Sequence, residues 1–127
     1  MESHSLVRDL PDFLRGRTRV VASSVPDTGE FVLYWMCTAV RDDENPALDV
    51  ARITAKNLNC PLLVYHGLSA SYPFASDRHH RFILEGARDA QASLLAKGIP
   101  YHFHLERPGD PPVLRLLAER ATLVITE

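Results

Sequence analysis

The 127-residue sequence has little cysteine, no long apolar run and almost no net charge, and each shortage excludes a class of protein. Its two cysteines, Cys37 and Cys60, lack the paired spacing of a zinc site and follow no secretory signal, which predicts reduced thiols in a cytoplasmic protein. No apolar run approaches the roughly 18 residues of a membrane-spanning helix. The formal charge of −2 gives no electrostatic reason to expect unaided binding to nucleic acid.

From residue 31 onward, apolar segments alternate with amphipathic ones. The apolar segments, each typical of a buried strand, are 31–36, 61–68, 100–105 and 122–126. The segments between them place apolar residues on one helical face, as do Leu48, Ala51, Ala55 and Leu58, and then Ile83, Ala87, Ala90 and Leu94. This alternation predicts an α/β fold with helices on both faces of a parallel sheet. Right-handed crossovers favour a doubly wound, Rossmann-like sheet in strand order 3-2-1-4, with strand 31–36 in its centre.

Local signals predict where the helices begin and end. The predicted starts are Asn45-Pro46, Asp77 and Asp110-Pro111, and the predicted end of the second helix is Lys97-Gly98. Asparagine and aspartate can cap the free N–H groups of a first turn, and proline fits the first helical position. Residues 1–30 carry prolines and glycines between polar residues, which predicts an amino-terminal arm in front of one α/β domain at 31–127.

The loop after the first strand is the expected place for a ligand. In doubly wound sheets, ligands bind beyond the carboxyl ends of the strands where the winding reverses, here between the first and fourth strands. Residues 37–46 contain no glycine, which excludes a dinucleotide site, and no P-loop motif occurs. The loop offers Arg41 beside Asp42, Asp43 and Glu44, which fits either a ligand-facing cation or a solvated turn before a helix.

Other candidate residues each have two interpretations. His102 and His104 lie two apart, as a metal pair on one face of a strand could, or as an edge strand half exposed to solvent would. The pair His79-His80 could meet a phosphate or simply be exposed in a first helical turn. Tyr34 and Trp35 could pack in the core or stack on a chromophore. The Asp42 to Glu44 cluster is the one feature that would suit a hydrolase.

Several stretches together resemble one family, the class II DNA photolyases. They are "RTRVVASSVPDTGEFVLYWM", "RDDENPALDVA", "YPFASDRHHRFILEGARD", "GIPYHFHLERPGDPP" and "ATLVITE". The second is similar to an Arg-x-x-Asp-Asn-x-Ala-Leu segment of that family, with Glu44 where the family usually has Asp. The third, at 72–89, is the most specific. The resemblance runs from about Arg17 to Glu127, and the ending "VITE" predicts an excised domain or a truncated relative.

The resemblance implies the amino-terminal α/β domain of a flavoprotein of the photolyase and cryptochrome family. Such enzymes repair cyclobutane pyrimidine dimers in DNA when light excites a reduced FAD, which donates an electron to the flipped-out dimer. In this family the FAD, the dimer pocket and the electron relay belong to a helical domain that follows. We therefore expect this chain to have no catalytic residues, no metal and no cofactor of its own, and to meet damaged DNA only through that helical partner domain.

The family also implies an antenna site. Its α/β domain can hold a deazaflavin, folate or FMN that passes excitation to FAD. In this sequence the candidate antenna residues are Met36, Cys37, Thr38 and Arg41, beside the crevice at the end of the first strand. The alternative is a free-standing Rossmann-like module that binds a small molecule or a partner and has no part in DNA repair.

Overall fold

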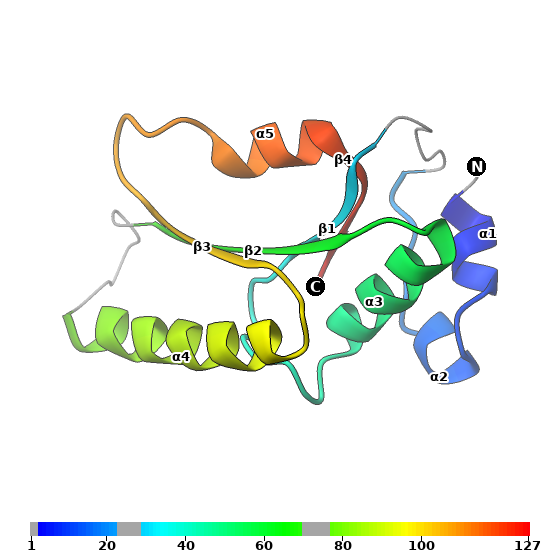
Figure 1. Ribbon diagram of the computed structural model, residues 1–127, viewed down its shortest axis with the longest axis horizontal. Helices are drawn as coiled ribbons and strands as arrows, with labels where there is room; N and C mark the ends of the chain where they lie inside the picture. The colour runs from blue at the N-terminus through cyan, green and yellow to red at the C-terminus, as the bar shows by residue number, and fades with distance from the viewer. Residues whose placement is uncertain (1–2, 23–28, 70–76) are drawn as a thin grey trace.

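The computed structural model describes residues 3–22, 29–69 and 77–127. In chain order, the elements are α1 (Ser3–Arg8), α2 (Asp12–Arg15), β1 (Phe31–Trp35), α3 (Pro46–Leu58), β2 (Leu62–Ser69), α4 (Asp77–Ala96), β3 (Tyr101–Glu106), α5 (Val113–Arg120) and β4 (Ala121–Thr126). The four strands lie side by side in the order β3-β2-β1-β4 (Figure 1). All three strand pairs are parallel, so the predicted doubly wound sheet with a central first strand is confirmed.

The helices cover the two faces of the sheet unequally. Helices α3 and α4 lie on one face, and α5 lies on the other (Figure 1). The larger core is between the sheet and the first of these layers, and its buried members are Val32, Tyr34, Met36, Leu48, Ala51, Ala55, Leu62, Val64, Leu94 and Ile99. The smaller core, under α5, is built on Leu33, Tyr65 and Ala121. Since α5 has only eight residues, it packs on β1 and β4 and leaves the ends of β2 and β3 for side chains to cover.

Helix α3 begins as the sequence predicts. Asn45 is the N-cap residue, and its side chain accepts a hydrogen bond from the N–H of Leu48, with Pro46 in the first turn. The helix ends at Asn59, which takes the left-handed conformation at φ 53° and returns its N–H to the last turn. The position of this helix start matters because it fixes where the loop after β1 must arrive.

The predicted cap of the third crossover helix is wrong. Helix α5 begins at Val113 rather than after Asp110, and within the described chain no side chain caps it. Asp110 instead accepts a hydrogen bond from the N–H of Arg107 and lies beside His104. Two consecutive prolines, Pro111 and Pro112, delay the helix because the residue before a proline is driven out of the helical conformation.

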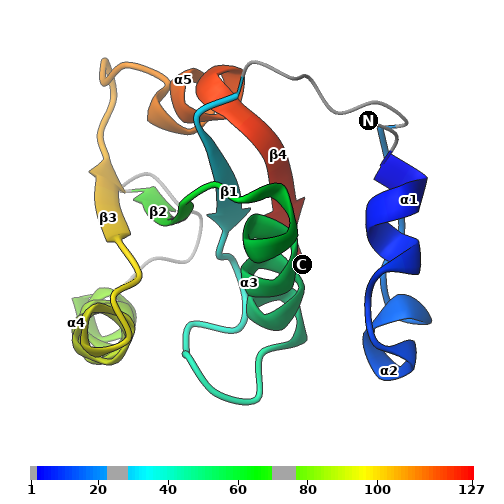
Figure 2. The ribbon, with the colours of Figure 1, turned by 45° about the vertical axis from the view of Figure 1, so that its right-hand side comes forward.

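The amino-terminal arm contains helices that its turn residues did not indicate. Leu10, between α1 and α2, and Leu14 of α2 are buried against Val50 of α3. Figure 2 shows α1 and α2 to one side of β4 and α3, beyond the last strand of the sheet. Residues of the arm and of β4 both line a cleft.

Candidate functional site

The carboxyl ends of β1 and β4 meet where the winding of the sheet reverses, which is the expected ligand position in this fold. The chain leaves β1 after Trp35, crosses this end of the sheet through residues 37–44, and enters α3. Two neighbouring side chains bind the backbone of that loop. One is the carboxylate of Glu127, at the end of β4, and the other is the amide of Asn45, at the start of α3.

Three consecutive backbone N–H groups of the loop converge on one oxygen of Glu127. The N–H groups of Cys37, Thr38 and Ala39 donate to its Oε1, with N···O distances of 2.8, 2.6 and 3.0 Å. Successive N–H groups that point to a common centre form a nest, a concavity that binds anions because the backbone dipoles add. The loop is thus an anion-binding nest, and the carboxylate of Glu127 is the anion in it.

Side chains near the nest reinforce the contact between β1 and β4. The hydroxyl of Thr126 donates to the backbone oxygen of Trp35 at 3.0 Å, and it lies 3.7 Å from the sulfur of Cys37. Burial raises the pKa of the Cys37 thiol, the hydroxyl of Thr126 opposes that shift, and the carboxylate of Glu127 adds to it. Since only a thiolate is strongly nucleophilic, this cysteine is not activated for chemistry.

Asn45 holds the same loop from the interior. Its Nδ2 lies 3.1 Å from the backbone oxygens of both Ala39 and Arg41, and 3.0 Å from the hydroxyl of Tyr34. Its Oδ1 accepts from the N–H of Leu48 at 3.1 Å. Asn45 is 1% exposed, and its contacts with Tyr34 and Leu48 are made away from solvent, so these two would be expensive to lose.

Tyr34 connects this arrangement to the core. It is fully buried on β1, and its hydroxyl is paired with the amide of Asn45. Burial raises the pKa of Tyr34 to about 12, and the hydrogen bond from Asn45 partly opposes the shift. The tyrosine predicted to be either core or chromophore-stacking is therefore a core residue with a polar end under the loop.

The predicted antenna residues have different environments. Cys37 and Thr38 contribute N–H groups to the nest, whereas the side chain of Met36 is buried between the sheet and α3. The guanidinium of Arg41 folds back on its own loop, where Nε lies 3.1 Å from the oxygen of Asp43 and Nη2 lies 3.1 Å from that of Glu44. Arg41 nevertheless lines the adjoining cleft.

One member of the acidic cluster at residues 42–44, Asp42, forms an ion pair. The carboxylate of Asp42 lies 2.8 Å from Nζ of Lys97, in the turn between α4 and β3. The hydrogen bond from Lys97 lowers the pKa of Asp42, so this carboxylate is ionised and paired. A paired carboxylate of low pKa is poorly suited to act as the general acid of a hydrolase.

A cleft of about 820 Å³ adjoins the nest. Its walls are the amino-terminal arm, the first turns of α3 and the whole of β4, and both Ala39 and Glu127 are part of its lining. Leu10, Leu14 and Val50 make its far side apolar. Pockets of about 300–1,000 Å³ with apolar walls and a few polar groups are typical of small-molecule sites.

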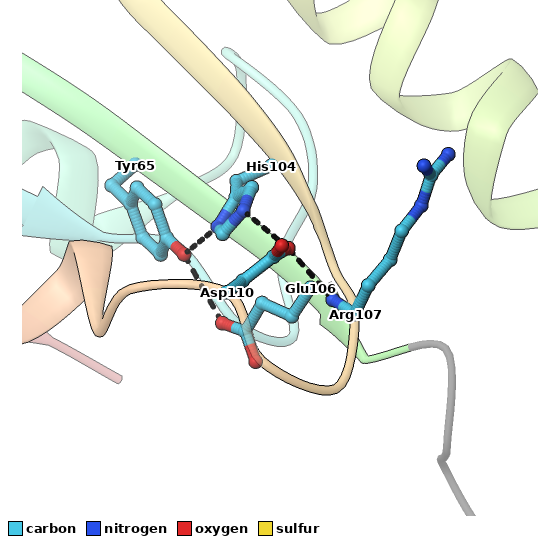
Figure 3. A network of polar contacts seen from close by, with 5 residues as sticks. All are labelled: Tyr65, His104, Glu106, Arg107 and Asp110. Carbon is cyan, nitrogen blue, oxygen red and sulfur yellow. Dashed lines mark hydrogen bonds and ion pairs between the residues drawn. The ribbon is translucent and has the colours of Figure 1, made fainter.

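A second polar cluster joins β2 and β3 (Figure 3), and its Tyr65 belongs to the core on the α5 side of the sheet. The hydroxyl of Tyr65 lies 3.1 Å from Nδ1 of His104 and 3.1 Å from a carboxylate oxygen of Glu106. Nε2 of His104 lies 3.4 Å from the carboxylate of Asp110. Gly67 makes room for the cluster, since a Cβ there would lie 2.7 Å from Glu106.

The cluster of Figure 3 is closed on itself. Each polar atom at its centre already faces another member, and burial together with Glu106 raises the pKa of Tyr65. The notion of a metal pair at His102 and His104 gains no support, because His104 faces Tyr65 and Asp110. Among the described residues, no group of three or more His, Cys, Asp or Glu could hold a metal ion.

A buried histidine lies on the opposite face of β2. His66 is 4% exposed, and its Nδ1 lies 2.8 Å from the hydroxyl of Tyr101. Burial lowers the pKa of His66, an effect that the charge of Glu127 partly opposes.

Sequence reasoning located the loop but missed the residue that fills it. Glu127 is 88 to 90 positions from the N–H groups it binds, and a single acid after a strand carries no local signal. The contacts of Asn45 with Ala39 and Arg41 were also missed, because a helix cap already explains an asparagine before a proline. The candidate histidines at 79 and 80 lie on α4, whereas the nest is formed by the loop after β1.

The sequence is similar to that of a photo-lyase. It is 39% identical over 112 residues to the deoxyribodipyrimidine photo-lyase of Methanothermobacter thermautotrophicus. The matched residues are 87% of this chain but 25% of that protein, so the chain spans about a quarter of the length of its relative. Over those residues the chain is photolyase-like. No protein-family model matches it.

Solved structures resemble it more weakly. A universal stress protein of Burkholderia pseudomallei has a TM-score of 0.44 at 20% identity, over 80% of this chain and 83% of its own. A universal stress protein of Archaeoglobus fulgidus has a TM-score of 0.43 at 15% identity, over 77% and 93%. In the parts of the chain that the structure describes, no helix is long and apolar enough to cross a membrane.

Proposed function

We propose that this chain is the amino-terminal α/β domain of a class II photolyase-like flavoprotein, in which it supports light-driven repair of cyclobutane pyrimidine dimers in DNA. The observation that carries the proposal is the 39% identity over 112 residues to a deoxyribodipyrimidine photo-lyase. The parallel sheet in the order β3-β2-β1-β4 is an α/β architecture, the class of fold that the resemblance implied. In this proposal the FAD and the dimer pocket belong to a helical domain outside these residues.

The domain itself is proposed to contribute no catalytic group. Its ionisable side chains near the crevice are committed elsewhere: Asp42 is paired with Lys97, and Glu127 lies in the nest. The thiol of Cys37 has a raised pKa. The proposed role of the domain is to dock the helical domain. A second proposed role is to bind an antenna pigment such as a deazaflavin, folate or FMN in the crevice at Cys37, Thr38 and Arg41, with Met36 beneath it.

A chimera tests the proposal directly. The matched quarter of the Methanothermobacter photo-lyase is replaced by this chain, and repair of thymine dimers under blue light is compared with that of the photo-lyase from which the quarter is deleted. We expect the chimera to recover light-dependent repair. Repair no better than that of the deletion, in a chimera that is folded and binds FAD, contradicts the proposal.

The chain alone provides the complementary measurement. We expect it to leave thymine dimers unrepaired under blue light, because the flavin chemistry needs a cofactor site that the proposal places in another domain. Any repair by these residues alone would show that the division of labour is wrong.

The second candidate function is a free-standing module that binds a small molecule. The cleft of about 820 Å³ beside an anion-binding nest favours it, since both features are present without any further domain. A chimera without repair, together with binding of small anions by the isolated chain, would favour this module over the photolyase domain.

A further inference from the structure

We infer that the nest at residues 37–39 is a binding site for the oxyanion of a small molecule, a phosphate or a carboxylate, and that Glu127 occupies it as a displaceable internal ligand. The crevice is the one used in the proposed function, so its physiological meaning rests on that function. The anion chemistry does not, because it depends only on three backbone N–H groups and on the carboxylate that meets them.

The first argument is the convergence of donors. Cys37, Thr38 and Ala39 direct their N–H groups at a single oxygen, all within 3.0 Å. Charge-assisted hydrogen bonds of this kind are shorter and stronger than neutral ones. A site that concentrates three donors on one oxygen selects an oxyanion of any origin, because backbone donors recognise charge and shape rather than a particular side chain.

The second argument is that the nest is held in shape without Glu127. The backbone oxygens of Ala39 and Arg41 are bound from the interior by Nδ2 of Asn45. Asn45 is itself fixed as the cap of α3 and by Tyr34. Removal of the carboxylate therefore leaves the peptide groups of the loop positioned, and a preorganised site loses less free energy when it binds.

The third argument is that water replaces part of the hydrogen bonding that Glu127 loses when it leaves the nest. Glu127 is exposed, so its carboxylate regains water when it leaves the nest. Hydration of the exposed carboxylate offsets part of the free energy of the hydrogen bonds that it gives up, whereas a buried carboxylate would stay unpaired. Exchange with an external anion is then a competition between two similar groups.

The fourth argument is the adjoining space. The apolar cleft between the arm and β4 reaches both Ala39 and Glu127, and Arg41 lies on its lining. A ligand with an apolar body in this cleft could place one acidic group in the nest. The class we infer is therefore an amphipathic small molecule with a single phosphate or carboxylate group.

The experiment follows the amide signals of Cys37, Thr38 and Ala39 by nuclear magnetic resonance in the 127-residue chain while inorganic phosphate is added at neutral pH. The variants are Glu127→Ala, which empties the nest, and Glu127→Gln, which keeps an acceptor oxygen but removes its charge. Glu119→Ala is the matched control, because it removes an exposed carboxylate that pairs with Arg115 within α5. Sodium chloride at equal ionic strength controls for screening, and sodium acetate replaces phosphate in a parallel series.

We expect the three amides of Glu127→Ala to shift together and to saturate. Phosphate should bind that variant at least about tenfold more tightly than wild type, a difference of about 1.4 kcal/mol. Glu127→Gln should fall between them, and Glu119→Ala should match wild type. Tighter binding of phosphate than of acetate identifies a phosphate ester as the ligand, and the reverse order identifies a carboxylic acid; either supports the site.

Two results would overturn the inference. One is a response of the three amides to phosphate no larger than their response to chloride in Glu127→Ala. The other is loss of the ordered signals of the loop in that variant without recovery when phosphate is added, which would make Glu127 a structural part of the loop. Neither result involves a pigment or DNA, so failure here is distinguishable from failure of the repair proposal.

Discussion

Asn45 and Glu127 hold one loop in two different ways. Asn45 is buried and donates to the backbone oxygens of Ala39 and Arg41, whereas Glu127 is exposed and accepts from the N–H groups of residues 37–39. A buried amide that loses its partners leaves polar groups without water, but an exposed carboxylate that loses its partners is hydrated at once. The comparison teaches that the interior residue shapes the loop and the surface residue occupies it.

The largest expected effect comes from the interior side of this comparison. Asn45→Ala removes the cap of α3 and the buried partner of the Tyr34 hydroxyl, together with a donor to the partly buried oxygens of Ala39 and Arg41. A lost cap costs about 1 kcal/mol, and each unsatisfied buried group costs about 1–3 kcal/mol. We expect the free energy of unfolding to fall by about 2–4 kcal/mol, measured by urea denaturation.

Two further variants separate the cap from the loop contacts. Asn45→Asp keeps an oxygen for the N–H of Leu48 but has no N–H to donate to Ala39 or Arg41, so we expect only partial recovery of stability. Asn57→Ala changes an exposed asparagine of the same helix and should be nearly neutral. Full recovery in Asn45→Asp would show that capping alone explains the residue.

The next effect concerns the partner of Asn45 on β1. Tyr34→Phe removes one buried hydrogen bond while the ring stays, so we expect a loss of about 1 kcal/mol. It should also change the alkaline limb of stability. Because the pKa of Tyr34 is raised from 10.0 to about 12, the folded wild type keeps a proton that the unfolded chain loses, and its stability falls as the pH rises above 10.0.

The measurement is the free energy of unfolding at neutral pH and in alkali for both proteins. Tyr34→Phe should lose less of its stability between these conditions than wild type does. Tyr101→Phe is the comparison variant: the pKa of Tyr101 is also raised to about 12 by burial, so its alkaline loss should shrink as well, but its hydroxyl pairs with His66 and not with Asn45. If Tyr34→Phe loses as much stability in alkali as wild type does, the raised pKa of this hydroxyl does not contribute to the loss above pH 10.0.

The part of this architecture that sequence could predict is the part set by local patterns. Continuous apolar runs predicted the strands, and the spacing of Asn45-Pro46 predicted both the start of α3 and its cap. The strand order followed from the handedness of crossovers, which is a property of chirality and not of particular residues. The location of the loop at the reversal point followed in turn.

What escaped prediction depends on contacts between distant residues. The carboxylate of Glu127 reaches N–H groups on another strand's loop, and Tyr65 joins Glu106 and His104 across two strands. Nothing near either residue in the sequence marks its partner. The wrong cap at Asp110 has a different cause: the local signal was real, but Pro112 and the contact with His104 prevailed over it.

A smaller effect is expected from the surface side of the comparison. Glu127→Ala removes hydrogen bonds that water can replace, so we expect a change in the free energy of unfolding of about 1 kcal/mol or less. Urea denaturation of this variant beside Asn45→Ala measures the contrast directly. A loss as large as that of Asn45→Ala would remove the distinction between the residue that shapes the loop and the one that occupies it.

The smallest expected effect is that of Arg41→Ala. The guanidinium of Arg41 is exposed and donates to the oxygens of Asp43 and Glu44 in its own loop, so solvent can replace it. Surface substitutions of this kind usually change stability by about 0.5 kcal/mol or less, and Arg88→Ala on the exposed side of α4 should behave alike.

If a pigment or phosphate used the guanidinium, Arg41→Ala would instead remove a charge-assisted hydrogen bond worth about 1.5–3 kcal/mol, and affinity would fall about tenfold or more. The guanidinium of Arg41 is turned toward the carbonyl oxygens of Asp43 and Glu44. We therefore expect the three N–H groups of the nest to keep most of the phosphate affinity when Arg41→Ala is combined with Glu127→Ala. A tenfold loss in that double variant would move the centre of the anion site from the backbone of residues 37–39 to the arginine.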